Sequence, residues 1–473
     1  MTVVGVSTKN LGGISRYVGN LRVCKYPNPV YPVNPKYKDQ ELAGYKIYES
    51  ISSIPNDPPI DLAIIAVPAK TTPITMEELG KKGVSFVHIF SSGFSELDSE
   101  SDKKGKELEE ELISIASKYG IRIIGPNCMG IHNPKGKMTF LMAPLITEGP
   151  VGFISQSGGI AVGHGMLSPT LGYYFSKNIS LGNQIDLDLI DFLRYFKDDP
   201  DTKIIGLYIE NLKRDGNTLV PLLRKITTNK PVIIWKGGKR QTGQQAVMSH
   251  TGGLAGDYKL WQAMARQTGT ILVDDLQELT EMVQTCLTYP IPKTLGTAVL
   301  SMSGGTAVQS TDNVEMNGLI MPRISEKTYK KINEYIPEVN SNLKNPLEFG
   351  GNNSMEATVK TIRLLAEEKQ FSSIIIETSP EFIVMRGGNS MDDYMRELSN
   401  ALPPDSDKLL MCVAQNMFMS EEGTKLNQEF RSKALSNGFV VYSSTIAAAK
   451  SGYRWWEYGQ YLKKRQLTRK KNK

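Results

Sequence analysis

Cysteine is scarce in this chain of 473 residues. It has only Cys24, Cys128, Cys286 and Cys412, and no two of them form a C-x-x-C pair. The sequence therefore indicates neither a zinc knuckle nor a disulfide framework, and the expected compartment is the reducing cytoplasm. Long apolar runs are missing as well, so no transmembrane helix is predicted. The amino terminus opens on a strand-like run, and we expect no signal or transit peptide there.

Most of the chain has no excess of charge of either sign. The formal net charge is +6, but residues 463–473 hold seven basic side chains and no acidic one. Without those seven, 48 basic residues face 49 acidic ones, so the body is close to neutral. The favoured interpretation of such a block is a solvated, disordered tail without a nucleic-acid partner. A contact of the tail with nucleic acid or an acidic partner is the alternative.

Strand-like runs alternate with helical patterns throughout, which predicts α/β units with parallel sheets. At this length we expect about three domains. The pattern divides the chain into blocks at 1–145, 148–290 and 295–455, followed by a basic tail at 456–473. The second and third blocks open alike, with a strand, a Ser-x-Ser-Gly-Gly turn and a helix start. This internal repeat predicts two related α/β domains.

Three turns in the first block suggest a nucleotide-like ligand. GVSTKNLGGISR places glycines between a strand and a helix, where backbone N–H groups can approach a phosphate. It is not a clean G-x-G-x-x-G, and no acidic residue follows at the spacing expected for the ribose of NAD. AVPAK and GPNCMG each end a strand, which is where open α/β sheets bind ligands.

The turn from Ser155 to Gly159, SQSGG, is a sharper signal. Hydroxyls and glycines at a strand-to-helix turn expose N–H donors at the positive end of a helix dipole, which favours an anion. The G-x-S-x-G pattern of a hydrolase nucleophile is not met. The turn from Ser301 to Gly305 offers the same chemistry a second time.

His250 lies in the segment MSHTGGLAG, one of only four positions with histidine. The preceding GKRQTGQQAVMS is predicted to be a polar, glycine-interrupted loop that exposes the side chain. Histidine can act as a nucleophile and could carry a phosphoryl group. Glu210 ends a strand in LYIENLKR, and a carboxylate beside an imidazole fixes its tautomer. Whether the two residues are neighbours cannot be read from the sequence.

Together these segments resemble the alpha subunit of the ADP-forming acyl-CoA synthetases, the acetate–CoA ligase (ADP-forming) group related to succinyl-CoA synthetase. The resemblance runs from Gly5 to about Ala448 and rests on VVGVS, YPVNPK, AVPA, GPNCMGI, FISQSGG, YIENLKRDG, SHTGGLAG, SMSGGTAV and NPLEFGG. It implies a Rossmann-like CoA-binding domain followed by two flavodoxin-like α/β domains.

The resemblance also implies roles for particular residues. His250 would carry the phosphoryl group and Glu210 would orient it. The phosphate would be held by Ser155, Gln156, Ser157, Gly158 and Gly159. CoA would be bound by Gly5, Ser7, Gly12, Gly13, Asn34, Pro35, Lys36, Val67, Pro68, Asn127 and Cys128.

The implied reaction converts a carboxylic acid, CoA and ATP into acyl-CoA, ADP and phosphate, by way of a phosphohistidine and an acyl phosphate. An acid–thiol ligase of this kind needs an ATP-grasp module, which has no counterpart here, and no Walker P-loop replaces it. We therefore expect a separate ATP-grasp beta subunit that brings ATP and Mg²⁺, in an α2β2 hetero-oligomer, and no metal site in this chain.

Two other functions stay open at this point. One is a non-catalytic CoA or acyl-CoA binding protein with the same fold, against which the retained His250 and SQSGG argue. The other is an NAD-dependent oxidoreductase, against which the missing ribose carboxylate and the second phosphate turn argue. The sequence does not identify the acid substrate.

Overall fold

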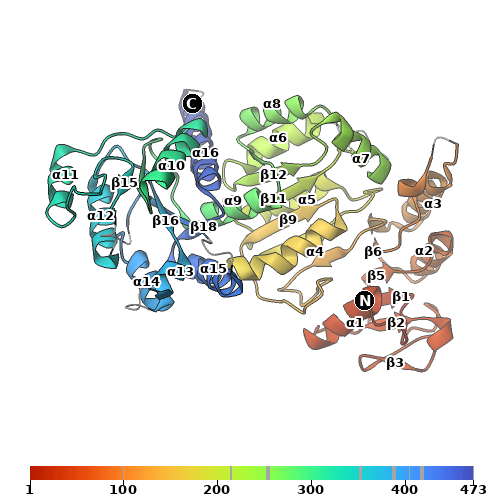
Figure 1. The fold of residues 1–473 in the computed structure, drawn as a ribbon. Coiled ribbons are helices and arrows are strands. Elements are labelled where there is room, and N and C mark those ends of the chain that lie inside the picture. Colours follow the sequence, from red (N-terminus) through yellow and green to blue (C-terminus); the bar gives the residue numbers. More distant parts are fainter. Residues whose placement is uncertain are drawn as a thin grey trace. The chain divides into compact units, whose positions relative to one another are not determined.

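The computed structural model describes residues 1–99, 101–213, 216–251, 256–350, 354–385, 390–403, 405–415 and 420–471. It describes the backbone but not the side chains of residues 246, 248–251, 385 and 468–471. The chain divides into two compact units, coloured red to green and green to blue in Figure 1. Unit 1 is Met1–Leu167 with Tyr174–Asp274, and unit 2 is Ser168–Tyr173 with Asp275–Lys473.

The first sheet of unit 1 has the strand order β2-β1-β5-β6-β7, and all its strands are parallel. Leaving out the small β3–β4 hairpin, this is the order 2-1-3-4-5 of a doubly wound fold. The strands are β1 (Thr2–Val4), β2 (Tyr31–Val33), β5 (Leu62–Ile65), β6 (Phe86–Ile89) and β7 (Arg122–Ile124). The other elements are α1 (Gly13–Val23), α2 (Thr72–Lys81), α3 (Lys104–Tyr119), β3 (Glu41–Leu42) and β4 (Tyr45–Lys46).

The second sheet of unit 1 has the order β13-β12-β11-β9-β10-β8. Only β8, in the described residues, runs antiparallel to its neighbour, and it comes from the chain before residue 145. The strands are β8 (Gly130–His132), β9 (Val151–Ser155), β10 (Phe175–Ser180), β11 (Ile204–Ile209), β12 (Val232–Lys236) and β13 (Ile271–Val273). The helices are α4 (Gly158–Leu167), α5 (Leu189–Asp198), α6 (Gly216–Ile226), α7 (Gln241–Thr251) and α8 (Tyr258–Thr268).

The third sheet lies in unit 2, with the parallel order β15-β14-β16-β17-β18, again 2-1-3-4-5. The strands are β14 (Thr297–Ser301), β15 (Leu347–Glu348), β16 (Ser373–Thr378), β17 (Leu409–Ala414) and β18 (Val440–Tyr442). The helices are α9 (Leu276–Thr288), α10 (Gly304–Met316), α11 (Glu326–Asn333), α12 (Met355–Glu367), α13 (Pro380–Met385), α14 (Met391–Ser399), α15 (Glu421–Ala434) and α16 (Thr445–Lys471).

The short apolar runs form strands because helices cover both faces of each sheet, so nearly every strand side chain is buried. In β16, for example, all residues from Ser373 to Thr378 are buried. Gly152 in β9 allows close packing, since a Cβ there would lie 2.8 Å from the Phe196 ring. The predicted fold class, α/β with parallel sheets and a CoA-binding-type domain before two flavodoxin-like domains, is confirmed.

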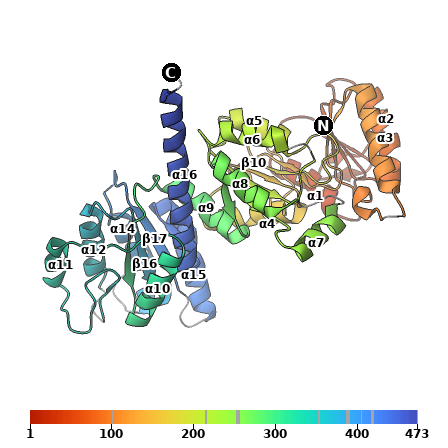
Figure 2. The same cartoon turned by 90° about the horizontal axis from the view of Figure 1, so that it is seen from above.

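Two segments differ from the sequence prediction. The stretch expected to be a polar loop before His250 is helix α7, despite Gly243 within it. The basic tail expected to be disordered continues α16 as helix to Lys471, and Figure 2 shows its last turns projecting from unit 2. Its described side chains from Lys463 to Leu467 are exposed or half-buried, so the segment is solvated as expected.

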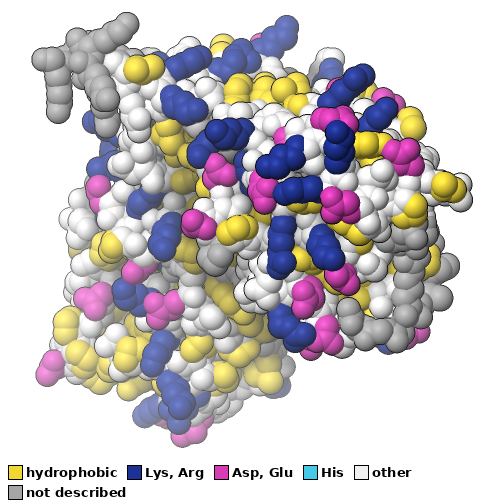
Figure 3. All heavy atoms as spheres, turned by 90° about the vertical axis from the view of Figure 1, so that its left-hand side faces the viewer, with side chains coloured by type: hydrophobic (Ala, Val, Ile, Leu, Met, Phe, Trp, Pro, Cys, Tyr) yellow, Lys and Arg dark blue, Asp and Glu magenta, His cyan; other side chains and the backbone are white. Residues whose placement is uncertain are grey.

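On the face in Figure 3, Lys and Arg side chains are interspersed with Asp and Glu. Ion pairs of unit 2 include Lys433–Asp392 (2.7 Å) and Lys425–Glu421 (2.7 Å). No helix of the described chain is both long and apolar enough to cross a membrane.

Candidate active site

The residues expected to bind CoA lie together at the carboxyl edge of the first sheet. They follow four of its strands, and that edge is where open α/β sheets bind ligands. Gly5, Ser7 and Gly12 lie between β1 and α1, and Gly13 is the first residue of α1. Asn34 to Lys36 follow β2, Val67 and Pro68 follow β5, and Asn127 and Cys128 follow β7.

Two of the polar side chains in this set shape the edge itself. Ser7 Oγ accepts the N–H groups of Lys9 (3.2 Å) and Asn10 (3.0 Å) and donates to Tyr37 Oη (3.3 Å). Asn34 Nδ2 donates to the Val6 carbonyl (2.6 Å), while its Oδ1 accepts the Lys36 N–H (2.9 Å). These contacts fix the turns after β1 and β2 relative to each other.

The start of α1 fits a ligand that carries phosphate. The helix begins at Gly13 with Gly12 as its N-cap, and its first turn has no acidic residue. Lys9 and Lys36 are exposed at the same edge. A helix dipole, backbone N–H groups and two cations favour the anionic end of CoA.

Cys128 differs from the expected CoA contact. Its side chain is buried, and Sγ lies 3.6 Å from the Ile89 carbonyl oxygen. Burial raises the pKa of this thiol, which keeps it neutral. The Cys128 carbonyl lies 3.1 Å from Nε2 of His88, whose pKa burial lowers to about 4. The Cys128 side chain therefore belongs to the packing below the edge.

The loop 125–130 joins this edge to the second sheet. Asn127 N–H donates to the Ser91 carbonyl of the first domain (2.9 Å), whereas Met129 N–H donates to Ser180 Oγ at the end of β10 (3.1 Å). A Cβ at Gly158, the first residue of α4, would lie 2.9 Å from Met129 Cγ. The loop expected to bind CoA thus contacts the turn expected to bind phosphate.

Ser155 and Ser157 build the second turn, between β9 and α4. Ser155 Oγ donates to the Ser157 carbonyl (2.7 Å), and Ser157 Oγ accepts the Ile160 N–H (3.3 Å), capping α4. Gly159 is exposed, and the nearest atom to a Cβ there would be Ser157 Oγ at 3.8 Å. This open N-terminus of α4 is suited to an anion.

Gln156 has a different role from the phosphate contact we expected. Its side chain is buried and turns toward the end of β11. Oε1 accepts the N–H groups of Glu210 and Asn211, and Nε2 donates to the Asn211 carbonyl (2.9 Å). Its own N–H donates to the Tyr208 carbonyl (3.2 Å). Its polar groups therefore join β9 to β11.

Glu210 lies directly after β11 and is 5% exposed. Tyr208 Oη donates to its Oε1 at 3.0 Å. Burial, followed by the Glu210 carboxylate, raises the pKa of the Tyr208 phenol, so the phenol stays protonated and donates. Both side chains project at the carboxyl edge of the second sheet.

Lys236, the last residue of β12, is a site residue that the sequence analysis missed. It is 1% exposed, and Nζ donates to the carbonyls of Glu210 (2.8 Å) and Gly237. The sequence feature that could have identified it is a lysine at the end of the apolar strand VIIWK. Lysine is almost never fully buried without partners.

His250 lies in the last turn of α7, and its side chain is outside the described residues. The connection from β12 to α7 is short, with Gly237 to Arg240 between them. Helix α7 lies near the 3-10 turn Ser95–Leu97, which follows β6 of the first sheet. Across the described side chains, no group of three or more His, Cys, Asp or Glu is suited to a metal ion.

Unit 2 contains the second Ser-x-Ser-Gly-Gly turn. Ser303 caps α10 in a capping box with Thr306, and Ser301 Oγ donates to Glu377 Oε2 (2.5 Å) at the end of β16. A cavity of about 540 Å³ adjoins this turn, with apolar walls that include Phe349, Phe382 and Ile383.

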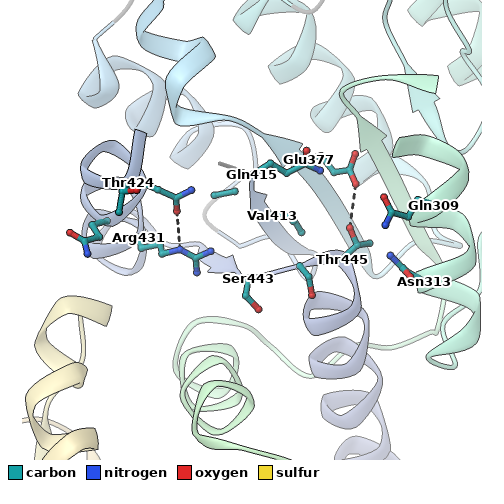
Figure 4. Close-up of a pocket in the computed structure, with 13 residues that line it drawn as sticks. Gln309, Asn313, Glu377, Val413, Gln415, Thr424, Arg431, Ser443 and Thr445 are labelled. Carbon is teal, nitrogen blue, oxygen red and sulfur yellow. Dashed lines mark hydrogen bonds between the residues drawn. The ribbon is translucent and has the colours of Figure 1, made fainter. Parts of the chain in front are cut away.

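Glu377 also borders a second, more polar cavity of about 450 Å³, drawn in Figure 4. Thr445 donates to Glu377 (3.2 Å), and Arg431 Nε donates to Asn427 (3.0 Å). The Arg431 guanidinium also donates to the carbonyls of Val441 and Tyr442, at 3.1 Å each. Both charged groups thus stabilise the carboxyl edge of the third sheet.

Comparisons with known proteins agree with this architecture. Residues 1–134 match the family described as CoA binding domain, and residues 148–286 match the succinyl-CoA ligase like flavodoxin domain. The chain is 34% identical over 427 residues to the ADP-forming acetate–CoA ligase II subunit alpha of Pyrococcus furiosus, with 90% of this chain and 88% of that protein covered.

Two further relatives extend the comparison. The chain is 35% identical over 381 residues to the ADP-forming acetate–CoA ligase I of Archaeoglobus fulgidus, covering 80% of this chain but only 54% of that protein. The solved acetyl-coenzyme A synthetase 1 of Ca. Korarchaeum cryptofilum, in complex with phosphate and ADP, has a TM-score of 0.80 and 26% identity, over 98% of this chain and 97% of that one.

Fold and site together define the class: a CoA-binding domain joined to domains of the succinyl-CoA ligase type. The chain belongs to the family of the ADP-forming acetate–CoA ligase alpha subunits.

Proposed function

We propose that this chain is the catalytic alpha subunit of an ADP-forming acyl-CoA synthetase. It would interconvert a carboxylic acid, CoA and ATP with acyl-CoA, ADP and phosphate. The observation that carries the proposal is the loop 125–130, which contacts the segment after β6 through Asn127 and the start of α4 through Met129. A CoA thiol and a phosphoryl group bound at these two edges would be neighbours.

His250 is the proposed phosphoryl carrier, and Glu210 the carboxylate that orients it. An imidazole nitrogen attacks the phosphorus of a phosphoryl donor, and the donor oxygen leaves. The substrate carboxylate oxygen then attacks the same phosphorus, which gives an acyl phosphate and frees the imidazole. The CoA sulfur attacks the acyl carbon, and phosphate leaves. The N-terminus of α4, with Ser157, Gly158 and Gly159, would hold the phosphoryl group through N–H donors and its dipole.

CoA would lie along the first carboxyl edge, held by the backbone of Gly12 and Gly13 and by Lys36, with Gly5, Ser7, Asn34, Pro35, Val67, Pro68 and Asn127 shaping that edge. Cys128 would contribute only backbone. We also propose the boundaries 1–145, 148–290 and 295–455 for the domains, and 456–473 for the terminal segment.

The nucleotide site would be on a partner. The match covers about half the length of the Archaeoglobus fulgidus relative, and the Pyrococcus furiosus relative is named a subunit. We propose an ATP-grasp beta subunit that binds ATP and Mg²⁺, an α2β2 assembly and a cytoplasmic location. The acid is acetate in the names of these relatives, and acetate is the first substrate to test.

Two measurements test this proposal. Calorimetry with the full chain is expected to detect CoA binding that weakens in Lys36→Ala. With an ATP-grasp partner, the chain is expected to form acetyl-CoA and ADP from acetate, CoA and ATP. CoA binding without turnover in the presence of the partner would favour the non-catalytic alternative, and absence of both would contradict the proposal.

A further inference from the structure

Lys236 is a buried cation that the proposed reaction does not yet use. It ends β12, directly beside β11, and its side chain is among the largest fully buried ones. Burying an ammonium group is costly unless it is well hydrogen-bonded. The position therefore needs a reason beyond packing.

The contacts of Lys236 lead to Glu210. Nζ donates to the carbonyl oxygen of Glu210 at 2.8 Å and to the Gly237 carbonyl. It also lies 5.7 Å from the centroid of the Trp261 ring of α8, within the range of a cation–π interaction. The ammonium thus has an acceptor on β11, an acceptor at the start of the β12–α7 connection and an aromatic face on a third element.

The same carbonyl acceptors belong to the two segments that must meet in the proposed reaction. Glu210 is the proposed orienting carboxylate, and Gly237 begins the short connection to α7, which carries His250. A Cβ at Gly237 would lie 2.9 Å from Tyr208 Oη and 3.5 Å from Glu210 Cγ, so this connection packs directly on the carboxylate.

We infer that Lys236 is a positioning residue that holds the Glu210 segment and the start of the β12–α7 connection in the geometry needed for phosphoryl transfer. Gln156 holds Glu210 and Asn211 from the β9 side, and Lys236 holds Glu210 from the β12 side. The inference rests on the proposed function, because it assigns Lys236 a purpose in orienting His250.

The ammonium form matters, since charge-assisted hydrogen bonds are stronger than neutral ones. Burial lowers the pKa of Lys236 to about 8, opposed by the Glu210 carboxylate. The Glu210 carboxylate is itself hydrogen-bonded by Tyr208, and the Trp261 ring that faces Lys236 is uncharged. Deprotonation above pH 8 weakens both bonds to carbonyls, so the rate of phosphoryl transfer is expected to fall on the alkaline side.

The test compares Lys236→Met with Lys230→Met in the full chain. Lys230 precedes the same strand at its opposite end, and its Nζ also donates to two carbonyls, those of Phe196 (2.7 Å) and Asp199 (2.6 Å). Phosphorylation of the chain by acetyl-CoA and labelled phosphate is measured from pH 6 to pH 10, alongside hydrogen exchange of peptides covering 205–213 and 237–245.

Lys236→Met is expected to slow labelling about 10- to 100-fold, as a misplaced catalytic group does. The fall in labelling rate near pH 8 is expected to disappear in this variant. Its two peptides are expected to exchange faster. Lys230→Met is expected to keep the wild-type rate, pH profile and exchange in those peptides. If Lys236→Met does not fold, Lys236→Arg is measured instead. Its retained charge should move the fall in labelling rate to a pH well above 8.

A wild-type rate and an unchanged pH profile in Lys236→Met, with unchanged exchange, would overturn the inference. If the wild-type chain takes up no label even with an ATP-grasp partner added, the proposed function fails, and the exchange data alone decide whether Lys236 holds the two segments. Unchanged exchange in Lys236→Met would then refute the positioning role.

Discussion

The side chain of Gln156 is joined to the backbone of Asn211 by a pair of hydrogen bonds. Its Oε1 accepts the Asn211 N–H at 2.9 Å, and its Nε2 donates to the Asn211 carbonyl at 2.9 Å. The turn after β9 and the end of β11 are thereby fixed to each other. In the proposed reaction, the first holds the phosphoryl group and the second carries Glu210.

Replacing Gln156 by alanine is expected to lower the free energy of unfolding by about 1–3 kcal/mol, because it leaves buried backbone groups without partners. Denaturant unfolding measures the change. Gln309→Ala is the control, since Gln309 is exposed and is expected to change stability by less than about 0.5 kcal/mol. Equal stability of the two variants would contradict a joining role for Gln156.

Tyr208→Phe removes the hydrogen bond from Tyr208 Oη to Glu210 Oε1 (3.0 Å). A bond to a charged group is worth about 1.5–3 kcal/mol, so phosphorylation of the chain is expected to slow at least several-fold. Tyr335→Phe serves as the control, because it removes a similar bond to Thr361 (2.9 Å) in unit 2. A rate lowered equally in both variants would indicate a general loss of stability.

Gly5→Ala is expected to destabilise the edge proposed to bind CoA. Gly5 has a φ of +96°, and a Cβ would overlap the carbonyl oxygen of Ala66. CoA affinity and the melting temperature should both fall. Gly19→Ala in α1 is the opposite control, since nothing lies within 4 Å of its Cβ, and it is expected to gain about 0.5–1 kcal/mol. A tolerated Gly5→Ala would show that the turn adapts.

Acid is expected to destabilise unit 1 through its buried histidines. Burial lowers the pKa of His88 and His132 to about 4 and that of His164 to about 3, from an ordinary value of 6.5. The unfolded chain therefore binds protons first as pH falls, and stability is lost by up to about 1.4 kcal/mol per pH unit for each histidine. The loss runs from pH 6.5 down to about pH 4 for His88 and His132 and to about pH 3 for His164.

Unit 2 provides the internal control for this effect, because no histidine follows residue 250. Hydrogen exchange of the full chain at pH 7 and pH 5 measures both units at once. Protection is expected to fall more in the sheets of unit 1 than in the third sheet. An equal loss of protection in both units would indicate that carboxylates, and not the histidines, cause the destabilisation.

Much of the fold could be predicted because short apolar runs ending in Gly, Pro or Asn form buried strands, as at β5 and β9. The positions of the carboxyl edges could be predicted from the same Gly, Pro and Asn residues at the strand ends. Helix α7 could not be predicted, since Gly243 and its polar neighbours are equally typical of a loop. The antiparallel β8 was also missed, because a three-residue strand has too short a pattern.

The roles of Gln156 and Lys236 depend on strand register, which sequence patterns do not specify. Ser155 is aligned with Tyr208, and Lys236 with Ile209. Only this pairing turns the amide and the ammonium toward the backbone of Glu210 and Asn211. A residue 54 positions away along the chain is therefore the partner of Gln156.

Labelling of His250 tests the central claim most directly. The full chain is incubated with acetyl-CoA and labelled inorganic phosphate, and then with a panel of other acyl-CoAs. An acid-labile, base-stable label is expected in the wild-type chain, and no label is expected in His250→Ala at unchanged melting temperature. A label of equal amount in His250→Ala, or none in the wild-type chain even with an ATP-grasp partner added, would contradict the account.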